Sequence, residues 1–269
     1  MRRFFLHLFV LLPFLSNAQN NFKPGYVITN SGDSIPGFIN YKEREQNPSS
    51  ISFRPKTNSP AHTYEISDVK AYGLFGLETY QRFIVDISQS KEALADISVG
   101  RDSTLTRDTV FLKVLQAGNK ITLYTYADNI KTRYYIKEKE SSEPYELVYA
   151  TYRIDETGKL KDYNKYIRQL TLLLLKNNLY TAVNQTKLQS ITYSKEGIVD
   201  IVSSINAKKA EKGMKSTRLF VGAAFNTSKA SYTGKSVFTG PGVTNKRSYA
   251  PMITAGIDLF ANPHIGRVV

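Results

Sequence analysis

Side chains that could perform catalysis are scarce in this sequence. The chain has three histidines, His7, His62 and His264, and no cysteine. A serine nucleophile of the triad type needs a histidine held between it and a carboxylate, but no Gly-x-Ser-x-Gly elbow accompanies any of the three. The lack of cysteine excludes thiolate metal sites and thiol redox chemistry. We therefore expect no catalytic residue and no metal ligand.

Two further patterns could carry chemistry, and neither is specific. Glu65, Asp68, Glu78 and Asp86 could supply a carboxylate pair for glycoside hydrolysis, but the sequence does not say which of them meet. The run FTGPGVTNK contains two glycines and a lysine, yet it lacks the spacing of a phosphate-binding loop. We expect a protein that is not an enzyme and has no cofactor.

The first 18 residues, MRRFFLHLFVLLPFLSNA, have the layout of a secretory signal peptide. Arg2 and Arg3 give a positive start, a short apolar run follows, and small residues precede a predicted cut between Ala18 and Gln19. The apolar run is shorter than the roughly 20 residues of a spanning helix. The pattern predicts export.

The chain is strongly basic, with a formal net charge of +13. Without Arg2 and Arg3 it has 34 basic and 23 acidic residues, a net charge of +11. Residues 187–247 contain eleven basic and three acidic residues, so most of the excess, +8, lies in one region. Because the chain is predicted to be exported, we expect phosphate-bearing lipid rather than nucleic acid as its anionic neighbour.

Residues 25–154 contain short runs rich in Tyr, Phe, Val, Ile and Thr, which suit pleated, half-buried surfaces. Turn signals separate them at intervals of about ten residues, which predicts an antiparallel β-domain. The runs are GYVITN, IPGFINY, ISF, HTYEI, VKAYGLF, ETYQRFIVDIS, DTVFLKVLQ, ITLYTYA, RYYIKE and YELVYATYRI. The polar segment from Ser88 to Arg107 predicts a long loop with a short helix at Lys91 to Ala95.

Two helices are predicted after Gly158. In DYNKYIRQLTLLLLKNN the apolar residues recur at helical spacing, with Asp162 as the candidate cap. The run TLLLLK is too short to cross a membrane and predicts a core helix. The second helix runs from Lys195 to Ala207 with Ser194 as its cap. The predicted fold class is mainly β with two helices (α+β), residues 19–207 forming a β-rich domain with two C-terminal helices packed on its sheet.

Residues 217–269 contain two strands of a different character. Apolar residues alternate with small or polar ones over 217–226 and 250–260, and a spanning strand takes about 9–11 residues. We predict that one face of this hairpin meets lipid, although an ordinary hairpin in a soluble sheet alternates too. The predicted lipid-facing residues are Leu219, Val221, Ala223, Phe225, Ile253, Ala255, Ile257 and Leu259.

Basic residues lie on both sides of the first of these strands. Residues 208–216, KKAEKGMKS, predict a basic linker. The loop between the two strands has no acid and four cations, Lys229, Lys235, Lys246 and Arg247, which are candidate contacts for the phosphates of lipopolysaccharide. A solvated loop explains the same pattern.

The run GYVITNSGDSIPGFINYKEREQNPSSISF, with YEISDVKAYG and FIVDIS after it, resembles a recurrent N-terminal domain of exported proteins from Bacteroidetes-type bacteria. In that family the domain precedes an outer-membrane β-barrel, and LFVGAAFN with YAPMITAGIDLFANP resembles the first two strands of such a barrel. The resemblance implies an envelope location and no catalytic residues. Because the smallest such barrels have eight strands, it also implies that residues 217–269 are the start of an incomplete barrel. The chain ends in Val269 instead of the aromatic residue typical of such barrels.

The sequence therefore predicts a non-enzymatic cell-envelope protein. Its β-rich domain would lie in the periplasm and its hairpin in the outer membrane, with a role in binding, transport or envelope structure. The alternative is a soluble periplasmic enzyme or glycan-binding module whose terminal hairpin belongs to its own fold.

Overall fold

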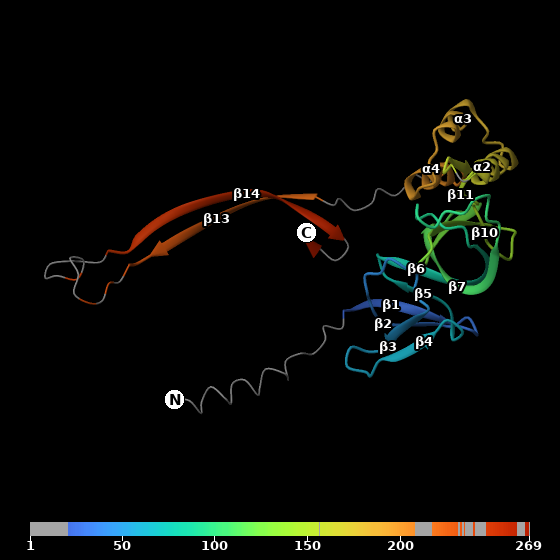
Figure 1. Ribbon diagram of the computed structural model, residues 1–269. Helices are drawn as coiled ribbons and strands as arrows, with labels where there is room; N and C mark the ends of the chain where they lie inside the picture. Colours follow the sequence, from blue (N-terminus) through green and yellow to red (C-terminus); the bar gives the residue numbers. More distant parts are fainter. Residues whose placement is uncertain are drawn as a thin grey trace. The chain divides into compact units, whose positions relative to one another are not determined.

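The computed structural model of the chain describes residues 21–155, 157–207, 217–230, 246–262 and 267–268, with Tyr232, Gly234 and Thr239 (Figure 1). It separates into two compact units, Met1–Ala210 and Glu211–Val269. The division falls within the segment 208–216 that the sequence suggests is a linker, whose residues lie outside the described part. Each unit is considered by itself.

The first unit is built on a ten-stranded antiparallel sheet, so the predicted β-rich, antiparallel domain is confirmed. Its strands are β1 (Phe22–Thr29), β2 (Ser34–Asn40), β3 (Ser50–Arg54), β4 (His62–Glu65), β5 (Val69–Leu74), β6 (Glu78–Ser88), β7 (Leu105–Gln116), β8 (Ile121–Ala127), β9 (Thr132–Glu138) and β10 (Tyr145–Glu146). The order across the sheet is β10-β9-β8-β7-β6-β5-β1-β2-β3-β4. On one side of β1 the chain adds β2, β3 and β4 in turn. It then returns to the other side of β1 and adds β5 to β10 in turn.

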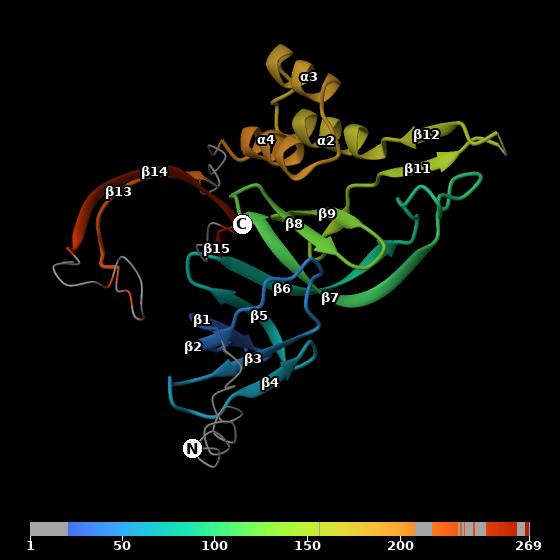
Figure 2. The same ribbon diagram turned by 60° about the vertical axis from the view of Figure 1, so that its left-hand side comes forward.

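Glycines allow this sheet to curl where β1, β2 and β5 meet (Figure 2). Gly25 of β1 pairs with Gly37 of β2. A Cβ on Gly25 would lie 2.3 Å from the carbonyl oxygen of Gly73 in β5, and a Cβ on Gly37 would lie 2.5 Å from the ring of Phe53. Glycine within a strand marks such close approaches, so these positions require it.

Three helices cover one face of the β8–β9 region (Figure 2). They are α2 (Lys165–Lys176), α3 (Ala182–Gln189) and α4 (Lys195–Ile205), and a small hairpin of β11 (Ala150–Arg153) and β12 (Leu160–Tyr163) precedes them. The core joins side chains of both layers, namely Ile121, Leu123, Tyr134 and Ile136 of the sheet and Leu170, Leu174, Ile198 and Val202 of the helices. Tyr124 and Tyr135 point to the opposite face and are buried in a second cluster, so both faces of β8 and β9 are covered.

The helix boundaries correct part of the sequence prediction. Ser194 caps α4 as predicted, its hydroxyl accepting a hydrogen bond from the backbone N–H of Gly197 at 3.2 Å. The prediction that Asp162 caps the preceding helix was wrong. Asp162 lies in β12, where it accepts a hydrogen bond from Thr151 at 2.8 Å, and α2 begins after Asn164. Here the hydrogen bond from Thr151 of β11 outweighs the preference of an aspartate for a helix N-cap.

The sequence analysis missed one helix and predicted another that is not there, in both cases because the local signal was weak. Helix α3 was not predicted: only Asn184 and Leu188 of its eight residues are buried, so it has no clear apolar face. The short helix predicted at Lys91 to Ala95 was wrong. That segment contains a turn in which the N–H of Asp96 donates to the carbonyl of Ala93 at 2.8 Å.

Four tyrosines connect the helices to the sheet. The ring of Tyr193 stacks on Tyr149 with centroids 4.8 Å apart, and it makes edge contacts with Tyr134 and Tyr166 at 5.1 and 5.0 Å. The Tyr193 hydroxyl donates to the carbonyl of Leu147 at 2.8 Å. Burial raises the pKa of Tyr193 well above the usual value and that of Tyr134 to about 12. In the folded state these tyrosines therefore keep their phenol protons to a higher pH.

We predict that the first unit loses stability as the pH rises above 10.0, the ordinary tyrosine pKa. In that range the unfolded chain releases phenol protons that buried tyrosines such as Tyr134 and Tyr193 retain, so the unfolded state binds fewer protons and is favoured. Each such tyrosine lowers the free energy of unfolding by about 1.4 kcal/mol per pH unit. Urea unfolding across the pH range, followed by circular dichroism and phenolate absorbance, measures this. Tyr134→Phe should lose less stability over the same range, and full ionisation of the tyrosines without unfolding would contradict the prediction.

Candidate functional site

The second unit is a long hairpin of β13 (Thr217–Ser228) and β14 (Ser248–Asn262), with β15 (Arg267–Val268) against the end of β14. Twelve residue pairs run from Thr217 opposite Leu259 to Ser228 opposite Ser248. Residues directly opposite each other in an antiparallel pair share a face. This register pairs Leu219 with Ile257 and Val221 with Ala255, so the eight residues predicted to face lipid lie on one face.

This face, which we call the apolar face of the hairpin, is exposed. Leu219, Val221, Phe225 and Ile253 are 77–81% exposed, and Ile257 and Leu259 are 62% and 54% exposed. Leaving a side chain of this size in water instead of burying it forgoes about 1.5–3 kcal/mol. Over six such residues the cost is on the order of 10 kcal/mol, comparable to the whole stability of a domain. The apolar face therefore needs an apolar neighbour.

The opposite face of the hairpin is mixed, because polar and small residues stand beside Phe220 and Met252, which are 43% and 50% exposed. Arg218 lies directly across from Asp258, and its Nε donates to Oδ2 at 2.9 Å. Gly222 pairs with Thr254, and the ring of Phe220 covers Gly256. The opposite face is therefore less apolar than the first, and it carries the ion pair between Arg218 and Asp258.

The predicted phosphate-binding cations gather at one end of the hairpin. Lys229 directly follows β13 and Lys246 and Arg247 directly precede β14, so all three flank the terminal pair Ser228–Ser248, and all are exposed. Lys235 lies outside the described residues, as do the predicted cleavage residues Ala18 and Gln19. The Arg218–Asp258 ion pair lies at the other end of the ladder.

The residues considered for catalysis have structural partners. His62 is exposed on β4 with its ring edge against Tyr64, centroids 4.7 Å apart. Asp68 accepts a hydrogen bond from the backbone of Glu65 in the turn after β4. Asp86 pairs with Arg107 at 3.3 Å. Within the described residues no group of three His, Cys, Asp or Glu side chains could hold a metal ion, and His264 lies outside them.

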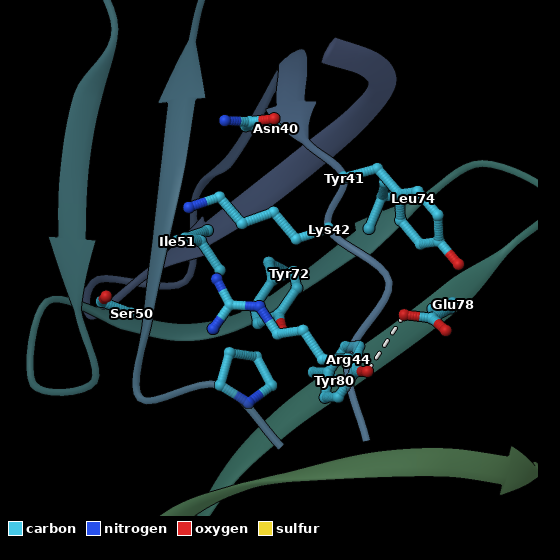
Figure 3. A pocket seen from close by; sticks show the side chains of 11 residues that line it. Asn40, Tyr41, Lys42, Arg44, Ser50, Ile51, Tyr72, Leu74, Glu78 and Tyr80 are labelled. Atoms are coloured by element: carbon cyan, nitrogen blue, oxygen red, sulfur yellow. Dashed lines mark hydrogen bonds between the residues drawn. The ribbon is translucent and has the colours of Figure 1, made fainter. Parts of the chain in front are cut away.

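Glu78 lines a small pocket with Arg44, Tyr72 and Tyr80 (Figure 3). The Tyr80 hydroxyl donates to Oε2 of Glu78 at 3.0 Å, and Lys113 forms an ion pair with the other carboxylate oxygen. Burial raises the pKa of Tyr72 and Tyr80 far above the usual range, so neither acts as a base. The pocket volume of about 30 Å³ holds about one water molecule. This geometry fits a structural polar contact rather than a substrate site.

A buried charged cluster, which the sequence did not reveal, lies between β6 and β9. Arg133 is fully buried, donates from Nε to the carbonyl of Ser88 at 2.8 Å and pairs with Asp128 at 2.9 Å. Lys131 is also buried and donates to Ser90 Oγ at 2.6 Å, while Glu146 accepts from Ser88. The sequence signal was a pair of cations two residues apart, Lys131 just before the aromatic strand β9 and Arg133 within it.

The environment of this cluster favours a structural role. Burial lowers the pKa of Lys131. Burial disfavours the charge of Asp128, but hydrogen bonds from the Lys131 amide and from Arg133 outweigh it and lower the pKa. The adjoining pocket, lined by Ser88, Ser90 and Tyr149, measures about 210 Å³, below the roughly 300–1,000 Å³ of small-molecule sites. The apolar face of the hairpin is therefore the strongest candidate functional surface.

Replacing Arg133 with Met tests the structural role. The change leaves Asp128 and the Ser88 carbonyl without their buried partner, so we expect a loss of about 3–5 kcal/mol in the free energy of unfolding. The matched control is Arg107→Met, whose exposed pairs with Asp86 and Glu143 should matter little. Urea midpoints of both variants measure the difference, and equal midpoints would contradict the buried cluster's role.

Comparisons with protein-family models, with curated proteins and with solved structures find no match. None of the helices in the described part of the chain combines the length and apolar character needed to cross a bilayer. The functional reasoning therefore rests on the residues and on the geometry of this chain.

Proposed function

We propose that this chain is a non-enzymatic cell-envelope protein whose hairpin β13–β14 belongs to an outer-membrane β-barrel. The first unit would lie in the periplasm, and the role would be binding, transport or envelope structure. The observation that carries the proposal is the exposed apolar face of the hairpin, whose opposite face carries the Arg218–Asp258 ion pair and small residues beside Phe220 and Met252. A hairpin with this division is suited to lipid on one side and water on the other.

The strand lengths support the same environment. β13 has 12 residues and β14 has 15. At about 3.3 Å per residue and a tilt of roughly 45°, 12 residues rise about 28 Å along the membrane normal. The apolar band of an outer-membrane barrel is about 25 Å tall, so each strand is long enough to cross it.

Charge and export support the placement of the two ends. The predicted signal peptide would send the chain across the inner membrane. Lys229, Lys246 and Arg247 at the loop end would meet the phosphates of lipopolysaccharide, and nucleic acid is not an expected partner. An unpaired strand edge in hydrocarbon costs several kcal/mol per backbone group, so the proposal includes further strands beside this hairpin.

A pair of neighbouring substitutions tests the lipid-facing assignment. Ile253→Arg puts a cation on the apolar face, where it should cost about 2–4 kcal/mol near the bilayer midplane and reduce stable insertion. Thr254→Arg puts the same side chain on the opposite face, where it should be tolerated. Fractionation of cells, with alkaline extraction of the outer membrane, measures insertion.

Equal insertion of the two variants would contradict the assignment of faces. Recovery of the natural gene product freely dissolved in the periplasm, without detergent, would contradict the barrel and favour the soluble alternative.

The loop cations are tested separately. We predict that replacing Lys229, Lys235, Lys246 and Arg247 by glutamine weakens lipopolysaccharide binding, at about 1 kcal/mol for each cation near the anionic surface. The control replaces Lys42, Lys56, Lys70 and Lys120 of the first unit by glutamine, which removes the same charge. Titration of lipopolysaccharide into the purified protein measures both variants, and equal binding would contradict the contact.

A further inference from the structure

Helix α2 presents leucines to solvent as well as to the core. Four leucines follow one another from Leu172 to Leu175. Leu173 and Leu174 are 3% and 0% exposed and belong to the core, whereas Leu172 and Leu175 are 56% and 49% exposed. A helix turns by about 100° per residue, so a run of four leucines cannot be buried on one side. Within the described residues the outer pair is therefore left about half exposed.

The two exposed leucines share their side of the helix with two cations. Lys165, Arg168, Leu172 and Leu175 lie within an arc of about 80° of the helix surface, at a turn of about 100° per residue. All four are exposed. Among the described residues neither Lys165 nor Arg168 has an ion-pair partner. We call these four residues the α2 stripe.

The sequence segment that contains the stripe has no acidic residue of its own. From Asn164 to Ser190 there are four basic residues and no acidic one. Lys176 and Lys187 pair with Glu138 and Asp200 from other segments, so the unpaired charge is concentrated on the stripe. Tyr180 and Val183, which follow α2, are 41% and 67% exposed and add apolar surface to the same acid-free segment.

We propose that the α2 stripe docks on an anionic phospholipid surface, with the helix lying along the membrane. Leucines can enter the boundary between headgroups and acyl chains, while the long stems of Lys165 and Arg168 let their charged ends reach lipid phosphates. The stripe combines aliphatic and cationic side chains without short hydrogen-bonding ones, which suits a fluid anionic interface. The 12 residues of α2 span about 18 Å, too short to cross a bilayer.

This docking surface belongs to the first unit and goes beyond the proposed function of the hairpin. It requires no barrel, because a peripheral helix binds any accessible anionic leaflet. If the barrel proposal is also correct, the leaflet would be the one that faces the periplasm.

A single introduced cysteine tests the proposal, because the full chain contains none. Leu172→Cys is labelled with a polarity-sensitive dye and mixed with vesicles of phosphatidylglycerol or of phosphatidylcholine. The dye should brighten several-fold and shift to the blue with phosphatidylglycerol alone. Thr63→Cys, on the exposed edge strand β4, is the matched control and should not respond. Adding Lys165→Gln and Arg168→Gln to Leu172→Cys should weaken vesicle binding about thirtyfold.

Several results of these measurements would overturn the proposal. They are no response at position 172, an equal response to both lipids, and an equal response at positions 172 and 63. A response at position 172 to envelope proteins but not to vesicles would replace lipid with a protein partner and also overturns it. The hairpin variant Ile253→Arg separates the two proposals, since it should reduce barrel insertion and leave the dye response at position 172 intact.

Discussion

Residues opposite each other in an antiparallel pair of strands point to the same side of the sheet. In β13–β14 this constraint gathers eight apolar side chains on one face and leaves Arg218, Asp258 and Thr254 on the other, together with Phe220 and Met252. A shift of one residue in the register of either strand would move the apolar residues of that strand to the opposite face. The proposed function rests on this division, since lipid on one side and water on the other would suit the two faces.

The first unit covers its apolar residues with other parts of its own fold. Its sheet is covered over β8 and β9 by three helices, and alternating residues such as Leu123 and Tyr124 enter two separate cores. The buried charges on this sheet are held by defined partners, Arg133 by Asp128 and by the carbonyl of Ser88. Removing one partner leaves the other charged group buried without a partner. The contact of Arg133 with Ser88 therefore holds β9 against the end of β6.

The exposed apolar residues and the cations are arranged differently in the two units. On the hairpin a whole face is apolar, and the cations Lys229, Lys246 and Arg247 stand apart at its end. On α2 the leucines and cations are interleaved along one stripe. A separated pattern suits insertion across a bilayer, with charges beyond its apolar band. An interleaved pattern suits adsorption at the interface, where each cation reaches a headgroup beside an inserted leucine.

The sequence by itself determined the features that depend on neighbouring residues. Residue types and turn signals located β1 to β9, although the run YELVYATYRI, predicted as one strand, divides into β10 and β11 of two different sheets. Alternation located the two hairpin strands, helical spacing located α2 and α4, and Ser194 marked the start of α4. Tertiary structure decided what depends on residues far apart in the chain. It paired Leu219 with Ile257, placed Asp162 in a strand instead of a cap, and buried Arg133 beside Ser88. Local patterns record propensity, whereas burial and pairing arise only when distant segments meet.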